Sequence, residues 1–285
     1  MSKRIKQTDL IIRDGGAFHI GLAPSQVPER IIAVGDPDRV SKVSQYFDRI
    51  DFKLNRREFV SHGGSYKGKD ILAISSGIGP DNVEIVMTEL DALVNVDLNT
   101  YLPKHEATRL SIVRVGTSGS MQADIPAGSE LVSTTAVGFD NLMSFYSLKQ
   151  SGFEDEVTIG IQRATALAFQ PYMVDCSTAS LGKVGFDLVR GNTATCPGFY
   201  APQGRQVRLD IRYPELLNQL SEYSNGRFRL TNFEMETASY YAFGRMLGHD
   251  MLSLNAILIN RVTNETTTNG DAIMDGLIRK VLERI

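Results

Sequence analysis

The stretch Ser111-Ile-Val-Arg-Val-Gly-Thr-Ser-Gly119 is the most informative part of this 285-residue chain. Its β-branched Ile112, Val113 and Val115 indicate a buried strand, and the Gly-Thr-Ser-Gly that follows predicts a tight loop. Arg114 lies within the strand, where a charge is costly unless an anion meets it. Glycines beside two hydroxyls let backbone N–H groups approach an anion closely. The stretch therefore predicts either a phosphate site at the carboxyl end of a sheet, or an ordinary turn with an arginine paired to a core carboxylate.

The composition is that of an ordinary soluble domain. A formal net charge of −3 gives no reason to expect nucleic acid or an acidic membrane as a partner. Cys176 and Cys196 are too few for a disulfide framework, and no cluster of His or Cys predicts a metal site. Residues 1–17 are expected to form a loose arm without an apolar leader, ahead of one domain over residues 18–285. A reducing cytoplasm is the expected compartment.

Apolar runs alternate with helical patterns over the rest of the chain. Strands are expected over residues 29–34, 70–75, 131–137, 181–189 and 251–259. Helices are expected over residues 83–94, 159–169, 232–247 and 271–284. A hairpin is expected with its turn at Gly63-Gly64, and residues 191–205 are expected to form a loop. This alternation predicts an α/β fold of three layers, α/β/α, with the site at the strand ends.

A second strand end offers another anion ligand. Gly35-Asp-Pro-Asp-Arg39 follows an apolar strand and brings Arg39 to the point where a helix begins. The pattern matches neither the GxGxxG dinucleotide motif nor the Walker A motif. Glu236, at the start of a later helix, either complements the helix dipole or accepts hydrogen bonds from a vicinal diol.

The loop expected over residues 191–205 carries a set of side chains suited to a planar heterocycle. Phe199 can stack on the ring, Gln203 offers a paired donor and acceptor, and Arg205 offers a fork of donors. A surface loop with incidental polar residues is the alternative interpretation.

Six motifs, in order over about residues 18 to 285, resemble the nucleoside phosphorylase superfamily, nearest to its uridine phosphorylases. They are Gly35-Asp-Pro-Asp-Arg39, Arg57-Glu-Phe59, Ser76-Gly-Ile-Gly79, Arg114-Val-Gly-Thr-Ser-Gly119, Phe199-Tyr-Ala-Pro-Gln-Gly-Arg205 and Phe233-Glu-Met-Glu236. The resemblance implies a central mixed, partly barrel-like sheet. It also implies reversible phosphorolysis of uridine to uracil and ribose 1-phosphate, with the nucleoside and inorganic phosphate as substrates and no cofactor.

The resemblance assigns roles residue by residue. Phosphate binding is implied for Gly35, Arg39, Arg57, Arg114 and Thr117. Ribose binding is implied for His19, Thr117, Met235 and Glu236. Base binding is implied for Ser118, Gly119, Phe199, Gln203 and Arg205. Catalysis is implied for Arg114, Arg39, Gln203 and Arg205.

Two of these residues, His19 and Arg57, are implied to come from a neighbouring subunit. The minimal active unit would then be a homodimer, and whether dimers assemble further into a hexamer stays open.

Several positions bear on specificity. Asn260-Arg261 stands where purine-specific relatives carry a Ser-Asp pair, which favours a pyrimidine. Pro202 replaces a glycine of the family pattern, so a broader choice of substrates that includes deoxyuridine, thymidine or purine nucleosides stays open.

A non-catalytic storage relative is a further alternative, although the retained arginines argue against it. A monovalent cation site is implied at Glu58 and Ile78, but Asn82 replaces its serine, which speaks against bound potassium.

Overall fold

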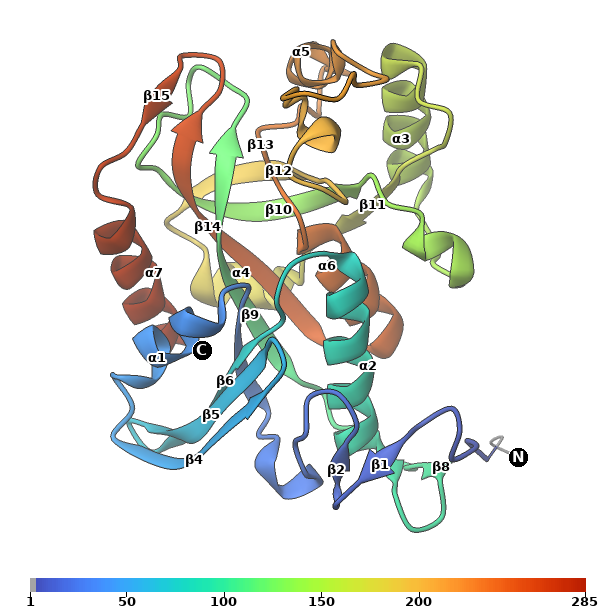
Figure 1. Ribbon diagram of the computed structural model, residues 1–285, viewed down its shortest axis with the longest axis vertical. Coiled ribbons are helices and arrows are strands. Elements are labelled where there is room, and N and C mark those ends of the chain that lie inside the picture. Colours follow the sequence, from blue (N-terminus) through green and yellow to red (C-terminus); the bar gives the residue numbers. More distant parts are fainter. Residues whose placement is uncertain (1–3) are drawn as a thin grey trace.

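The structure, a computed structural model, describes residues 4–285, and a closed ring of five strands forms its centre (Figure 1). Around the ring lie β9 (Ser111–Ser120), β14 (Asp250–Asn260), β10 (Glu130–Gly138), β12 (Val189–Thr195) and β13 (Asn232–Glu234). The ring closes because β14 pairs with both β10 and β9. Parallel and antiparallel pairs both occur, so the expected mixed, partly barrel-like sheet is confirmed.

An open sheet extends from β9 away from the ring. In spatial order it contains β3 (Arg30–Val34), β6 (Lys69–Ser75), β5 (Phe59–Tyr66) and β4 (Arg49–Arg56). The short strands β11 (Tyr172–Asp175) and β15 (Glu265–Thr266) join the ring at β10 and β14. Two small hairpins lie apart from this sheet, made of β1 (Ile12–Arg13) with β2 (Gly16–Ala17), and β7 (Val96–Asp97) with β8 (Leu102–Pro103).

Helices cover the sheet on both faces, which confirms the three-layer α/β/α arrangement (Figure 1). One face carries α2 (Pro80–Asn95) and α6 (Thr237–Leu247). The other carries α1 (Pro37–Ser44), α4 (Thr178–Val184) and α7 (Gly270–Arg284). α3 (Gly152–Thr165) and α5 (Leu216–Glu222) pack on the far side of the ring with residues of β10 to β13.

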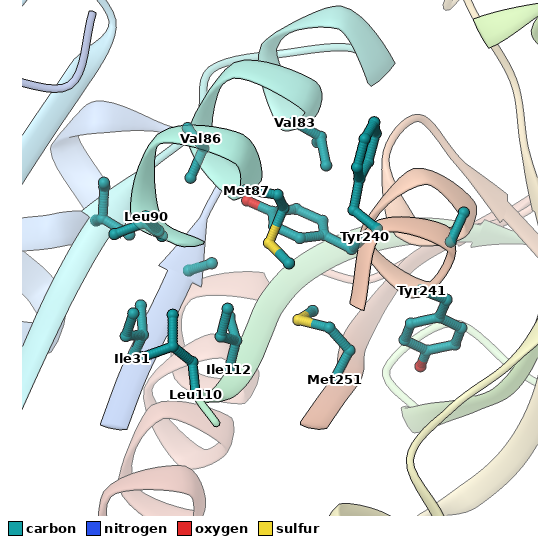
Figure 2. Close-up of a cluster of buried hydrophobic side chains, with 14 of the residues drawn as sticks. Ile31, Val83, Val86, Met87, Leu90, Leu110, Ile112, Tyr240, Tyr241 and Met251 are labelled. Atoms are coloured by element: carbon teal, nitrogen blue, oxygen red, sulfur yellow. The ribbon is translucent and has the colours of Figure 1, made fainter. Parts of the chain in front are cut away.

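The strand β3 shows how the sequence produces these layers. Ile31 and Ala33 face the α2–α6 layer, whereas Ile32 and Val34 face α1 and α7, because successive strand residues point to opposite faces. Figure 2 shows the α2 side, where Met87 lies among side chains of β3, β9 and α6. A strand apolar on both faces is typical of a sheet with two helical covers.

The interior of the ring is polar rather than apolar. Ser133, Thr193, Asn232, Ser253 and Asn255, from four of its strands, are all fully buried. Four of them bond from strand to strand, and Ser253 bonds to Asn255 on its own strand, so buried polar groups find partners inside the ring itself.

The tight loop expected after Val115 does not exist. β9 continues through Gly116 to Ser120 because β14 pairs with it along its whole length and β13 pairs with Gly119 and Ser120. Gly116 is needed for a different reason: a Cβ there would lie 2.3 Å from Nη1 of Arg114, which shares its face of the strand.

The prediction of a hairpin turn at Gly63-Gly64 was also wrong. Both glycines lie inside β5, and the chain turns at residues 57–58 instead. A Cβ on Gly63 would lie 2.1 Å from the Phe52 ring, and one on Gly64 would lie 2.1 Å from the Arg49 carbonyl oxygen. These glycines therefore permit close contact between strands rather than a change of direction.

Four further element predictions need correction. The helix expected over residues 232–247 is α6, which begins only at Thr237, because residues 232–234 form the ring strand β13. Residues 181–189, expected as a strand, contain the end of α4, which Ser177 caps by accepting a hydrogen bond from the Ser180 N–H. The following strand β12 occupies residues 189–195, the first part of the expected loop. The helix expected over residues 159–169 is α3, which begins earlier at the capping box of Ser151 and Glu154.

The described part of the expected loose arm is packed. Leu10 is buried in a small cluster with Ala92, Val96 and Tyr101, and the Ile5 N–H donates to the Tyr101 carbonyl. No helix within residues 4–285 is both long enough and apolar enough to cross a membrane.

Candidate active site

A cavity of about 790 Å³ is lined by residues of β9, β13 and β14 and by Gly35, which follows β3. Of the site residues expected from the sequence, those that line it are Gly35, Arg39, Arg114, Thr117, Ser118, Gly119, Phe199, Gln203, Arg205, Met235 and Glu236. These residues come from separate parts of the chain. β3 and β14 run parallel to β9, whereas β13 runs antiparallel to β9 and brings Met235 and Glu236 back along it.

Arg114 lies at the floor of the cavity between two carboxylates. Its Nη2 is 2.5 Å from Oε2 of Glu236 and 3.0 Å from Oε2 of Glu234, and all three side chains are almost fully buried. Burial acts to lower the pKa of Arg114, but the two carboxylates outweigh burial and the pKa is raised. The two sequence interpretations are thus compatible: Arg114 is paired to core carboxylates and also lines a cavity that an anion can enter.

Glu234 holds this cluster together, and the sequence analysis did not single it out. Its carboxylate accepts hydrogen bonds from the Thr195 hydroxyl and from the N–H groups of Glu236 and Thr237, which caps the start of α6. Two glutamates at the start of a helix fit the helix dipole, and only Glu236 was also predicted to bind a ligand, as an acceptor from a vicinal diol.

Glu236 faces the cavity from the start of α6. Its Oε1 accepts a hydrogen bond of 2.9 Å from the N–H of Gly79, and its Oε2 pairs with Arg114. Burial raises the pKa of Glu236, Arg114 opposes this effect, and Glu234 adds to it, with a net increase. This carboxylate can accept hydrogen bonds from ligand hydroxyls.

Arg39 approaches Arg114 from the first turn of α1. Asp36 caps that helix by accepting from the Asp38 N–H, and Arg39 donates to the Val115 carbonyl oxygen over 3.3 Å. Burial and the neighbouring Arg114 lower the pKa of Arg39. Two guanidinium groups that repel each other across a cavity are typical of an anion site.

A second group of side chains lines the other part of the cavity. The Arg205 guanidinium lies 3.9 Å from the centre of the Phe199 ring, donates to the Phe199 carbonyl oxygen and bonds to the amide oxygen of Gln203. Gln203 is buried, at the end of the short 3-10 turn Ala201–Gln203 that Pro202 occupies. A stacking surface, an amide and a guanidinium therefore converge as expected.

Arg261 is a cation beside the Phe199, Gln203 and Arg205 group. From the sequence it was predicted only as part of the Asn260-Arg261 motif, without a role of its own. Its Nη1 lies 3.5 Å from the Gln203 carbonyl oxygen, and its charge, after burial, lowers the pKa of Arg205. Its neighbour Asn260 has a structural role, because its amide oxygen accepts from the N–H groups of Val262 and Thr263.

Two expected site residues do not line the cavity. The ring Nδ1 of His19 is 2.7 Å from Glu89, which also accepts from the backbone N–H groups of His19 and Ile20. Arg57 is exposed in the β4–β5 turn, with a φ of 57°. These are the two residues that the resemblance assigns to a neighbouring subunit.

The described residues contain no group of three or more His, Cys, Asp or Glu side chains arranged around a metal position. Glu58, Ile78 and Asn82 do line the cavity, and the Asn82 amide donates to the Ile78 carbonyl oxygen over 3.2 Å.

The fold and this cavity define the class of protein. The family model described as the phosphorylase superfamily matches residues 29–280, so the chain belongs to that superfamily, as the motifs predicted.

Individual relatives agree with this assignment. The chain is 30% identical over 260 residues to a uridine phosphorylase of Thermococcus kodakarensis, covering 90% of this chain and 82% of the relative. It is 26% identical to a uridine phosphorylase of Haemophilus influenzae over 88% of each chain. A solved nucleoside phosphorylase of Trypanosoma brucei, described as showing uridine phosphorylase activity, is 30% identical with a TM-score of 0.87, over 96% of this chain and 98% of that one.

Proposed function

We propose that the protein is a uridine phosphorylase, which converts uridine and inorganic phosphate reversibly to uracil and ribose 1-phosphate. One observation carries the proposal: a single cavity joins the Arg39–Arg114 pair and Glu236 to the Phe199, Gln203 and Arg205 group. The first part suits a phosphate and a ribose diol, and the second suits a uracil ring. The uridine phosphorylases among the relatives support the same reaction.

The reaction depends on positioning and electrostatics rather than on a covalent enzyme intermediate. Arg39 and Arg114 hold the phosphate dianion beside the ribose, and Glu236 holds the ribose hydroxyls. A phosphate oxygen forms a bond to C1′ while the C1′–N1 bond breaks, and that electron pair leaves with uracil. Arg205 and Gln203 stabilise the developing negative charge, and the proton released by phosphate ends on uracil N1. No cofactor takes part.

A non-catalytic storage role is disfavoured by the same cavity. A binding or storage protein has no need of two guanidinium groups held against each other at a cost in electrostatic repulsion.

Potassium is not required in this proposal, since the Asn82 amide places a donor beside the Ile78 carbonyl oxygen. The cytoplasm remains the expected compartment, because both cysteines are free thiols.

The complete site requires a second copy of the chain. His19 and Arg57 lie outside the cavity of their own chain, and both are accessible enough to contact another subunit. A homodimer in which each chain lends these residues to its partner would complete the phosphate and ribose sites, whether or not dimers assemble further.

The deciding experiment measures release of uracil from uridine with and without inorganic phosphate, with inosine as the control substrate. Phosphate-dependent cleavage of uridine and not of inosine supports the proposal. Cleavage without phosphate would indicate a nucleosidase, cleavage of inosine a broader phosphorylase, and cleavage of neither substrate would contradict the assignment.

A further inference from the structure

A continuous chain of hydrogen bonds runs once around the inside of the strand ring. We call it the barrel chain. From one strand to the next it consists of Arg114 on β9, Asn255 on β14, Ser133 on β10, Thr193 on β12, Asn232 on β13 and Ser118 on β9 again. Its two ends lie four residues apart on the same face of β9, and both line the cavity.

The bonds of the barrel chain have one consistent direction, which starts from Arg114 and is fixed at its far end by Asn232. A guanidinium has only donors, so the Asn255 atom that faces Arg114 at 3.4 Å must be the amide oxygen. The Asn255 amide nitrogen then donates to the hydroxyl of Ser133 over 3.1 Å. The hydroxyls of Ser133 and Thr193 lie 2.6 Å apart, and since Thr193 uses its hydrogen on the amide oxygen of Asn232, Ser133 is the donor of this pair.

The same reasoning continues to the far end. Thr193 accepts from Ser133 and donates to the amide oxygen of Asn232 over 3.0 Å. The Asn232 amide nitrogen therefore faces Ser118 and donates to its hydroxyl oxygen over 3.0 Å. Within residues 4–285 the hydroxyl hydrogen of Ser118 has no acceptor, and Ser118 lines the cavity.

We propose that the barrel chain fixes Ser118 as a hydrogen-bond donor toward the base, so that the site selects a carbonyl oxygen at that position. Asn232 is a positioning residue, because it acts only through Ser118. The inference rests on the proposed uridine phosphorylase activity. A base with an exocyclic amino group at this point would meet a donor with a donor, and the unpaired polar groups would lower its affinity.

The proposal is tested with uridine, 2-thiouridine and 4-thiouridine as substrates, because sulfur accepts hydrogen bonds poorly. In the wild-type enzyme, the analogue that carries sulfur in place of the oxygen facing Ser118 should show a lower kcat/KM than uridine. In Ser118→Ala, the preference for uridine over that one analogue should shrink by about two- to tenfold, the size of one uncharged hydrogen bond. The preference over the other analogue should stay unchanged.

The direction of hydrogen bonding along the barrel chain is tested with Asn232→Asp at pH 8. A carboxylate at position 232 has no hydrogen to donate, so Ser118 would turn its hydrogen toward it and away from the cavity. Asn232→Asp should therefore lose the same preference as Ser118→Ala. Asn192→Asp is the matched control. Asn192 lies on β12, but it is not a member of the barrel chain, and its amide donates to the carbonyl oxygen of Arg229.

Each outcome has a distinct meaning. Wild-type enzyme that does not cleave uridine would refute the proposed function rather than the role of Ser118. Given wild-type activity, an unchanged preference in Ser118→Ala would overturn the donor assignment. Loss of the preference in Ser118→Ala but not in Asn232→Asp, or an equal loss in Asn192→Asp, would overturn the role of the barrel chain.

Discussion

Arg205 covers the aromatic surface that a base would use. Its guanidinium lies 3.9 Å from the centre of the Phe199 ring, and it also bonds to Gln203, so the protein alone satisfies the group that would recognise uracil. Binding of a base is therefore an exchange of one set of contacts for another, and the net gain comes from the charge that develops as the glycosidic bond breaks.

We expect Arg205→Ala to lower kcat/KM for uridine roughly 100-fold, because removal of a donor to a developing anion typically has this effect. The KM for phosphate should change little, since Arg205 does not belong to the Arg39–Arg114 pair. Steady-state kinetics with each substrate varied in turn would measure both. Full activity in Arg205→Ala would show that the base binds elsewhere.

The raised pKa of Glu236 gives a prediction for pH. In the proposed reaction its ionised form accepts hydrogen bonds from the ribose hydroxyls, and burial raises its pKa above the ordinary value of 4.5. Activity should therefore fall as the pH decreases through a midpoint above 4.5, because protonation removes the acceptor. A pH profile of kcat/KM for uridine would locate this midpoint.

Glu236→Gln is the control for this profile. Its activity should be lower throughout, and the acidic decrease that belongs to Glu236 should be absent, while the titration of phosphate itself remains. An identical acidic limb in Glu236→Gln would assign the ionisation to another group.

At the scale of elements, close contact between β4 and β5 depends on glycine. A Cβ on Gly64 would meet the Arg49 carbonyl oxygen, a backbone atom that cannot move without breaking the strand pairing. We expect Gly64→Ala to lower the free energy of unfolding by about 1–3 kcal/mol, measured by urea denaturation.

Gly152→Ala is the matched substitution, because nothing lies within 4 Å of a Cβ at that first residue of α3. It should leave stability unchanged or slightly higher, since alanine is the better helix former. Equal destabilisation by both substitutions would contradict the steric explanation for Gly64.

The same glycines show what the sequence could and could not predict. Strong local signals located the strands β3, β6, β10 and β14 and the helices α2, α6 and α7. The glycines of β5 and β9 were misread as turns, because the side chains that crowd them, such as Phe52 and Arg114, approach only in the folded state. The short α4 was misread as a strand because an apolar run of that length does not separate the two periodicities.

The candidate site shows a similar division. Arg114, Glu236 and Arg205 carry chemistry that their local motifs reveal, and the structure places them in one cavity. The contacts of Glu234 with Arg114 and of Arg261 with Gln203 join residues that are distant in the sequence. These contacts could not be inferred from spacing alone.

At the scale of the whole molecule, the position of His19 and Arg57 predicts that subunits share active sites. We expect Arg114→Ala and Arg57→Ala to be severely impaired separately. After dissociation and mixing, about half of the dimers contain one chain of each kind, and each such dimer has one complete site. Mixing should therefore restore about a quarter of the wild-type activity.

A mixture of Arg114→Ala with Arg39→Ala is the control for this complementation. Both residues belong to the cavity of their own chain, so no exchange of partners creates a complete site. Recovery in this control, or no recovery in the first mixture, would contradict the shared site.

The closure of the strand ring has a consequence for how the chain folds. β9 finds its longest partner in β14, where Ser111 pairs with Asp250, so the ring cannot close until residues 250–260 have left the ribosome. Until then β9 carries an unpaired edge, and Arg114 is without its carboxylate partners for as long as residues 234–236 have not been synthesised. Such non-local pairing slows folding and exposes an aggregation-prone edge. The ring that holds Arg114 beside its two carboxylates thus makes newly synthesised chains dependent on late assembly.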